Sequence, residues 1–157
     1  MGVFDIAGDF AYFAWEGDLN VFKINLKTKQ HTSFGEKTSL YRKPKATKTA
    51  LEGLKARRFK EMAKEKKKQS YVKKIFATEK NVLLVYSARG ANGENKGDRL
   101  QFYTNEGRYI KEEPLPVETG RTLCMDKKKS IIYILSSDLD SDDNTLFYIH
   151  TYSIGPK

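Results

Sequence analysis

The sequence predicts an all-β fold made of three repeated antiparallel units, with one α-helix inserted after the first unit. Runs rich in aromatic and β-branched residues recur in pairs joined by turns, at residues 10–24, 81–104 and 130–152. Between the first two copies the composition changes, because residues 41–74 carry 14 Lys and Arg against 3 Asp and Glu, whereas the remainder carries 15 against 17. The excess positive charge is therefore confined to one segment, and the β units are close to neutral.

The first unit covers about residues 3–34. Strands are expected at 3–6, 10–15, 19–24 and 30–34. Gly8 and Asp9 supply the first turn, and residues 16–18 form a hairpin turn in which Gly17 can take a positive φ at no steric cost. Leu19 and Val21 alternate with Phe22 and Ile24, which is the period of a strand with two different faces.

The basic insertion, residues 41–70, is expected to hold an amphipathic α-helix at about 47–69. Helix-forming residues dominate from Ala50 onward, and Thr47 or Thr49 is a suitable N-cap. At 100° per residue, four apolar side chains fall within an arc of roughly 140°: Leu51, Leu54, Phe59 and Met62. This stripe needs burial, so the segment is best explained as a solvated helix packed over one of the β units.

The second unit covers about residues 71–113, with strands at 71–77, 81–87, 99–104 and 108–112. The third covers about 121–154, with strands at 121–125, 130–135 and 145–152. Polar loops are expected at 89–98 and 136–144, where Gly, Asn, Asp and Ser dominate. No fourth strand follows in the third unit, which leaves a sheet edge without a partner.

Repeated antiparallel units of this size are typical of β-propeller blades or similar β arrays. The run LQFYTNEGRYI at residues 100–110 is similar to a blade signature in which an aromatic-rich strand ends at a Glu-Gly turn. The basic run beginning YRKPKATK at residue 41, with the helix and strand that follow it, resembles a helical insertion between blades. The chain thus resembles the bacterial six-bladed β-propeller family related to the NHL and TolB-like propellers.

Six blades of roughly 40 residues need about 240 residues, and the chain has 157. Three explanations remain open: the C-terminal half of a longer propeller, two copies that together supply six blades, or a different compact β fold. Open sheet edges readily pair with other chains, so the unpaired blades are expected to meet another chain, either a protein partner or a second copy.

The function expected from this interpretation is a non-enzymatic binding or interaction module, with protein partners and, as a further option, a small-molecule or glycan ligand. One alternative is a propeller-type hydrolase or lyase, which would need a convergent polar cluster. The sequence offers only His31 and His150, with a single Cys124 expected to be a small buried hydrophobe in a strand. It contains no His and Cys residues at the spacing of a zinc site, no G-x-S-x-G nucleophile elbow, and no Walker or Rossmann motif for binding phosphates. No cofactor is expected.

A metal site is the weaker interpretation of the acidic run at residues 138–144. Asp138, Asp140 and Asp142 alternate like the first oxygen ligands of a calcium loop. Asp143 stands where such a loop needs Gly, and Ile149 where it needs Glu, so a solvated hairpin loop is favoured.

A further alternative is binding to nucleic acid or an anionic surface through the basic helix, because cations release counterions from phosphates. The apolar stripe is not explained by such binding, so nucleic acid is the less favoured partner. The basic surface would consist of eight residues: Lys55, Arg57, Arg58, Lys60, Lys64, Lys66, Lys67 and Lys68.

The aromatic residues are expected to lie mostly in the core between units, with some available to line a glycan or peptide site. They are Phe10, Tyr12, Phe13, Trp15, Phe22, Phe102, Tyr103, Tyr133, Phe147 and Tyr148. The printed chain shows neither a signal-peptide pattern nor an apolar stretch near the roughly 20 residues that cross a bilayer. The resemblance does not fix the cellular compartment. Export is one option, if a signal peptide precedes Met1.

Overall fold

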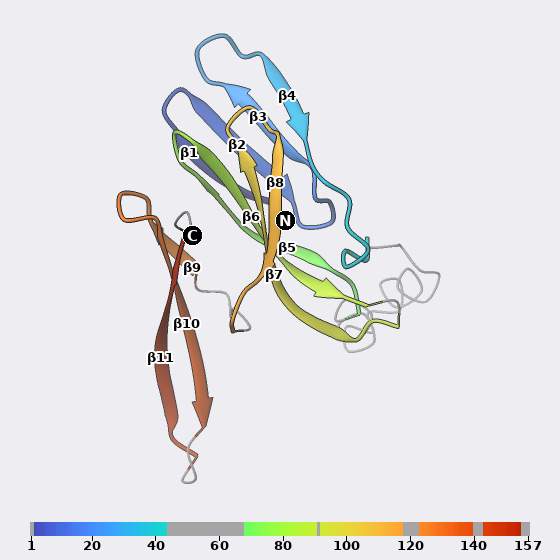
Figure 1. Cartoon of the computed structure of the whole chain (residues 1–157), viewed down its shortest axis with the longest axis vertical. Helices are drawn as coiled ribbons and strands as arrows, with labels where there is room; N and C mark the ends of the chain where they lie inside the picture. The colour runs from blue at the N-terminus through green and yellow to red at the C-terminus, as the bar shows by residue number, and fades with distance from the viewer. Residues whose placement is uncertain (1, 44–67, 91, 118–122, 140–142, 155–157) are drawn as a thin grey trace, which may run out of the picture.

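The computed structural model describes residues 2–43, 68–90, 92–117, 123–139 and 143–154. These residues form strands in three antiparallel sheets, drawn in Figure 1. The first sheet has the order β1-β2-β3-β4, the second β5-β6-β7-β8, and the third β11-β10-β9. In the first two sheets each strand pairs with its neighbour in sequence, and the prediction of an all-β fold with three antiparallel units is confirmed.

The strand bounds follow the predicted pattern closely. The first sheet contains β1 (Gly2–Ala7), β2 (Phe10–Trp15), β3 (Val21–Asn25) and β4 (His31–Phe34). The second contains β5 (Tyr71–Ala77), β6 (Asn81–Arg89), β7 (Asn95–Thr104) and β8 (Tyr109–Pro114). The third contains β9 (Leu123–Asp126), β10 (Ile131–Leu139) and β11 (Thr145–Ser153).

Two hairpins extend further than their polar sequences indicate. Pairing of β6 with β7 continues to Arg89 and Asn95, past a register shift, so the loop expected at 89–98 is shorter. Pairing of β10 with β11 runs through to Leu139 and Thr145, inside the loop expected at 136–144. Ladder hydrogen bonds join backbone groups and do not require apolar side chains, so composition alone placed these turns too early.

Residues 44–67 lie outside the described part of the chain, and they hold almost all of the helix predicted at 47–69. The predicted end of that helix is wrong, because Lys68 and Gln69 form a turn and a bend rather than helix. Ser70 is buried just beyond them, with its N–H donating to the carbonyl of Arg42 at 3.0 Å. This bond joins the residue just before β5 to the segment that follows the first sheet. The described residues contain no helix that could cross a membrane.

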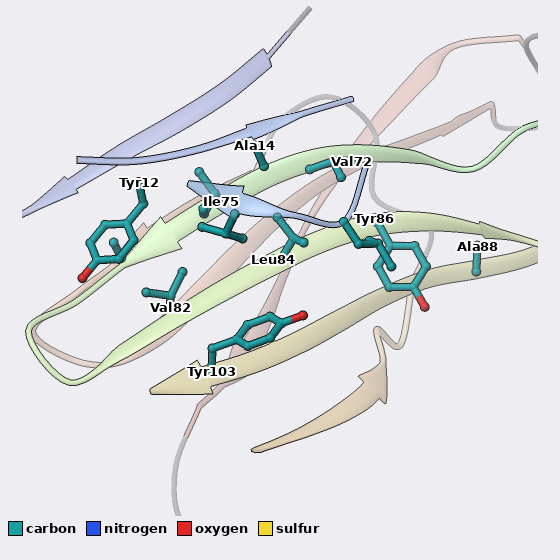
Figure 2. Close-up of a cluster of buried hydrophobic side chains, with 12 residues drawn as sticks. Tyr12, Ala14, Val72, Ile75, Val82, Leu84, Tyr86, Ala88 and Tyr103 are labelled. Atoms are coloured by element: carbon teal, nitrogen blue, oxygen red, sulfur yellow. The ribbon is translucent and has the colours of Figure 1, made fainter. Parts of the chain in front are cut away.

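The second sheet lies between the other two, and both of its faces are buried. One apolar cluster joins the first sheet to the second; Figure 2 shows Tyr12 of β2 beside Ile75 and Val82, and Ala14 of β2 near Val72. A second cluster joins the opposite face of the second sheet to the third, through residues such as Leu83 and Ile134. Every β6 residue between Asn81 and Arg89 is consequently buried.

Side-chain bonds at β1 tie the three sheets together. One carboxylate oxygen of Asp5 accepts a 2.8 Å hydrogen bond from the backbone N–H of Ala77, at the end of β5. Lys127, in the turn between β9 and β10, donates to the other Asp5 oxygen and to the carbonyl of Ile6, both at 2.9 Å. The first strand therefore carries a junction that contacts both other sheets.

Candidate functional site

The densest polar cluster in the described residues lies on the second sheet, around Glu112 of β8. Its carboxylate accepts hydrogen bonds from the Tyr86 hydroxyl at 2.9 Å, from Gln101 Nε2 at 3.0 Å and from Arg99 Nε at 3.2 Å. Tyr86 lies directly opposite Arg99, and Gln101 directly opposite Glu112, so strand register alone places all four on one face.

The cluster continues to the segment that leaves the first sheet. The Tyr103 hydroxyl donates to Gln101 Oε1 at 2.6 Å and accepts from the backbone N–H of Glu36 at 2.9 Å. Gln101 Nε2 also donates to the carbonyl of Glu36 at 3.3 Å. The Tyr41 ring meets the Tyr86 ring edge-on, with centroids 5.5 Å apart. These contacts hold residues 36–41 against the second sheet.

The electrostatics of the cluster favour an inert arrangement. Burial, reinforced by the Glu112 carboxylate, raises the pKa of Tyr86 well above its ordinary value. Burial likewise raises the pKa of Tyr103. Both phenols stay protonated near neutral pH and act as hydrogen-bond donors, while Arg99 supplies a positive charge beside Glu112. The side-chain groups bond one another, so the arrangement orders a chain segment rather than activating a nucleophile.

The sequence-based prediction missed this cluster, although β7 carries a signal for it. In β7, Arg99, Gln101 and Tyr103 alternate with the apolar Leu100 and Phe102. A strand buried on both faces normally reads as a continuous apolar run. Polar side chains at every second position of such a strand therefore indicate a buried polar network on one face.

A second buried charge lies in the N-terminal half of β7. Asp98 is buried, and Lys73 Nζ lies 2.7 Å from its Oδ2. Lys73 sits at the register shift in β5 between Val72 and Lys74. The bulge turns this lysine toward Asp98, so the ion pair joins β5 to β7 across the sheet.

Of the predicted metal ligands, the structure describes only Asp138; Asp140 and Asp142 lie outside the described residues. Asp138 is exposed near the end of β10, and its Oδ1 accepts the backbone N–H of Leu139 at 2.9 Å. Among the residues that the structure describes, no three His, Cys, Asp or Glu side chains are grouped to hold a metal ion.

Of the predicted basic surface, only Lys68 is described, in an exposed turn before β5. The other seven residues lie in the part of the chain that the structure does not describe. The two histidines do not meet: His31 is exposed on β4, whereas Nε2 of His150 lies 2.7 Å from the Ser136 hydroxyl in the third sheet.

The outer faces of the first and third sheets are the other candidate region. On the first sheet Phe4 is 70% exposed and Trp15 54%, and on the third Phe147 is 70% and Ile149 72% exposed. Cys124 is also exposed, on the same outer face as Tyr133, because that register position faces away from the second sheet. The prediction that Cys124 is buried is therefore wrong.

The aromatic residues divide according to which face they occupy. Tyr12, Phe102 and Tyr103 are buried as expected, whereas Trp15, Phe147 and Tyr148 are exposed. Alternation along a strand predicts two faces, but it does not reveal that the outer sheets are covered on one face only. Both outer faces are thus apolar surfaces open to solvent.

A scan against protein-family models, a search of curated proteins and a search of solved structures found no match to this chain.

Proposed function

We propose that this chain is a non-enzymatic interaction module of the β-propeller type, and that it binds other protein chains, its own copies included. The observation that carries the proposal is the unequal coverage of the sheets. The second sheet is buried on both faces, whereas the first and third each present one apolar face to solvent. Exposed contiguous apolar surface on a soluble protein marks an interaction site.

The architecture supports the propeller type of arrangement. The first two sheets are four-stranded antiparallel meanders, and the three sheets stack through apolar faces. A stack of this kind needs further sheets or a partner at each end, as a repeat array needs neighbours to bury its faces. The hydrolase or lyase alternative gains nothing from the Glu112 cluster, because its groups bond each other.

The proposal is tested by sedimentation velocity over a wide concentration range. We expect a mass above the 18.0 kDa of a single chain, increasing with concentration. Phe4→Lys, on the open face of the first sheet, is expected to weaken association that uses that face. The matched control is Gln30→Lys, which adds the same charge at an exposed position before β4 of the same sheet. A strict monomer at every concentration would contradict self-association.

A further inference from the structure

The outermost strand of the third sheet, β11, is a long edge. It covers Thr145–Ser153 and pairs only with β10 among the described strands, whereas the first two sheets each have a fourth strand. The backbone N–H of Ile154 donates to the carbonyl of Ser130 at 2.8 Å, on the β10 side. Because backbone groups alternate in direction along an antiparallel strand, those of Phe147, Ile149 and Thr151 point away from β10.

The edge lacks the devices with which proteins protect exposed strands. Its nine residues, TLFYIHTYS, include no Asp, Glu, Lys, Arg, Pro or Gly. Charged side chains, proline and shortness are the usual protections. Phe147 and Ile149 are the most exposed large apolar side chains on it, at 70% and 72%.

The other edges are protected or covered. The edge strand β8 carries Lys111, Glu112 and Glu113 and ends at Pro114, and β4 and β9 have only four residues each. The edges of β1 and β5 lie against each other, joined by the bond from Ala77 to Asp5. Within the described chain, β11 alone combines length, apolar character and an open ladder.

We propose that β11 pairs antiparallel with β11 of a second copy, about a two-fold axis at Ile149, so that two third sheets join into one six-stranded sheet. This deepens the proposed function and rests on it. Ile149 is the middle residue of the strand, so this register pairs all nine residues, and a shift in either direction leaves some unpaired.

The cross-strand partners in this register are compatible. Ile149 faces its own copy and Phe147 faces Thr151, while Tyr148 faces His150. The register therefore brings no two side chains of like charge opposite one another. Phe147, Ile149 and Thr151 are also the residues with outward backbone groups, so each of these pairs exchanges two hydrogen bonds. A two-fold interface of this kind is closed, because each edge is used once.

The decisive experiment places charges at the proposed axis. Ile149→Lys puts two ammonium groups opposite each other, as Ile149→Glu does with two carboxylates. Each variant alone is expected to raise the dissociation constant at least about tenfold in sedimentation equilibrium. An equimolar mixture of the two is expected to restore association, because Lys then faces Glu. Ser137→Lys, an exposed position of the neighbouring β10, is the matched control and should associate like the parent.

The register has its own test. Phe147→Lys should be rescued by Thr151→Glu in a mixture, and not by Phe147→Glu. Ile149→Cys, made together with Cys124→Ser, should form a disulfide-linked dimer on mild oxidation, since directly opposite Cα atoms of a hydrogen-bonded pair lie about 5.5 Å apart, within disulfide reach. This readout does not depend on whether a charged variant folds.

The outcomes separate this inference from the proposed function. Association that persists in Ile149→Lys but is lost in Phe4→Lys would overturn pairing through β11 and leave the interaction module intact. A parent protein that is monomeric at all concentrations, together with an Ile149→Cys variant that yields no linked dimer, would overturn both the pairing through β11 and the self-association in the proposed function. Capture of an unrelated peptide on β11 with no second copy bound would also overturn the self-pairing proposed here.

Discussion

Glu112 shows how one carboxylate organises a buried region. It accepts bonds from a phenol, an amide and a guanidinium, and two of these donors, Tyr86 and Gln101, are themselves buried. Removing the Glu112 carboxylate takes an acceptor away from these buried donors, and water does not reach them to take its place. Breaking a buried charge pair from one side costs about 3–5 kcal/mol, more than the net contribution of the pair itself.

We therefore expect Glu112→Ala to lower the free energy of unfolding by about 3 kcal/mol, because Arg99 and Tyr86 lose their shared acceptor. Urea titration followed by circular dichroism measures this change. Glu79→Ala removes a carboxylate at an exposed position and should change stability by less than about 0.5 kcal/mol. Equal effects of the two substitutions on the free energy of unfolding would contradict a stabilising role of the Glu112 cluster.

Tyr152 links the third sheet to the second and should make the protein sensitive to alkali. Its hydroxyl bonds Glu113, and burial together with that carboxylate raises the pKa of Tyr152 to about 12. Below the ordinary pKa of about 10, both folded and unfolded chains hold the proton. Between pH 10 and 12 the unfolded chain loses it first, so the free energy of unfolding falls as pH rises.

Unfolding free energies measured from pH 9 to 12, with phenolate absorbance recorded in parallel, test this expectation. Tyr152→Phe should reduce the fall in the free energy of unfolding above pH 10. Part of that fall should remain in the variant, because the pKa values of Tyr86 and Tyr103 are also raised. A pH dependence identical in the parent and in Tyr152→Phe would contradict it.

At the scale of elements, the strand β1 acts as a junction rather than as a free edge. Asp5 receives a backbone N–H from β5 and the ammonium of Lys127 from the turn after β9. The two bonds differ in environment. The side chain of Lys127 is 41% exposed, which makes its ion pair with Asp5 a surface pair of small value. The bond from the N–H of Ala77 is more costly to lose, because Ala77 is buried.

Asp5→Ala is therefore expected to destabilise the fold by about 1–3 kcal/mol, the cost of a buried donor left unsatisfied. Lys127→Ala should cost at most about 1 kcal/mol. Chemical denaturation of both variants, with exchange of the Ala77 amide as a local readout, distinguishes the two contributions. If Lys127→Ala costs as much as Asp5→Ala, the ammonium rather than the backbone bond is the main partner of Asp5.

At the scale of the whole molecule, local patterns predicted the strands well. Alternation and turn residues located all eleven strands of the described chain. Arrangements that depend on distant partners were not visible in the sequence. The Glu112 cluster needs register across three strands, and the exposure of Phe147 and Cys124 depends on which face of the third sheet meets the second. Seven of the eight residues of the predicted basic surface and two of the three metal candidates lie outside the described residues.

The link between Asp5 and Lys127 also sets an order of events during synthesis. The two residues are 122 positions apart, so the first strand leaves the ribosome long before its last partner is made. At 5–20 residues per second the wait is on the order of 10 s, far longer than a hairpin takes to form. The second sheet, which covers the apolar inner face of the first, is made within that time, so the contact with Lys127 forms after those two sheets can join.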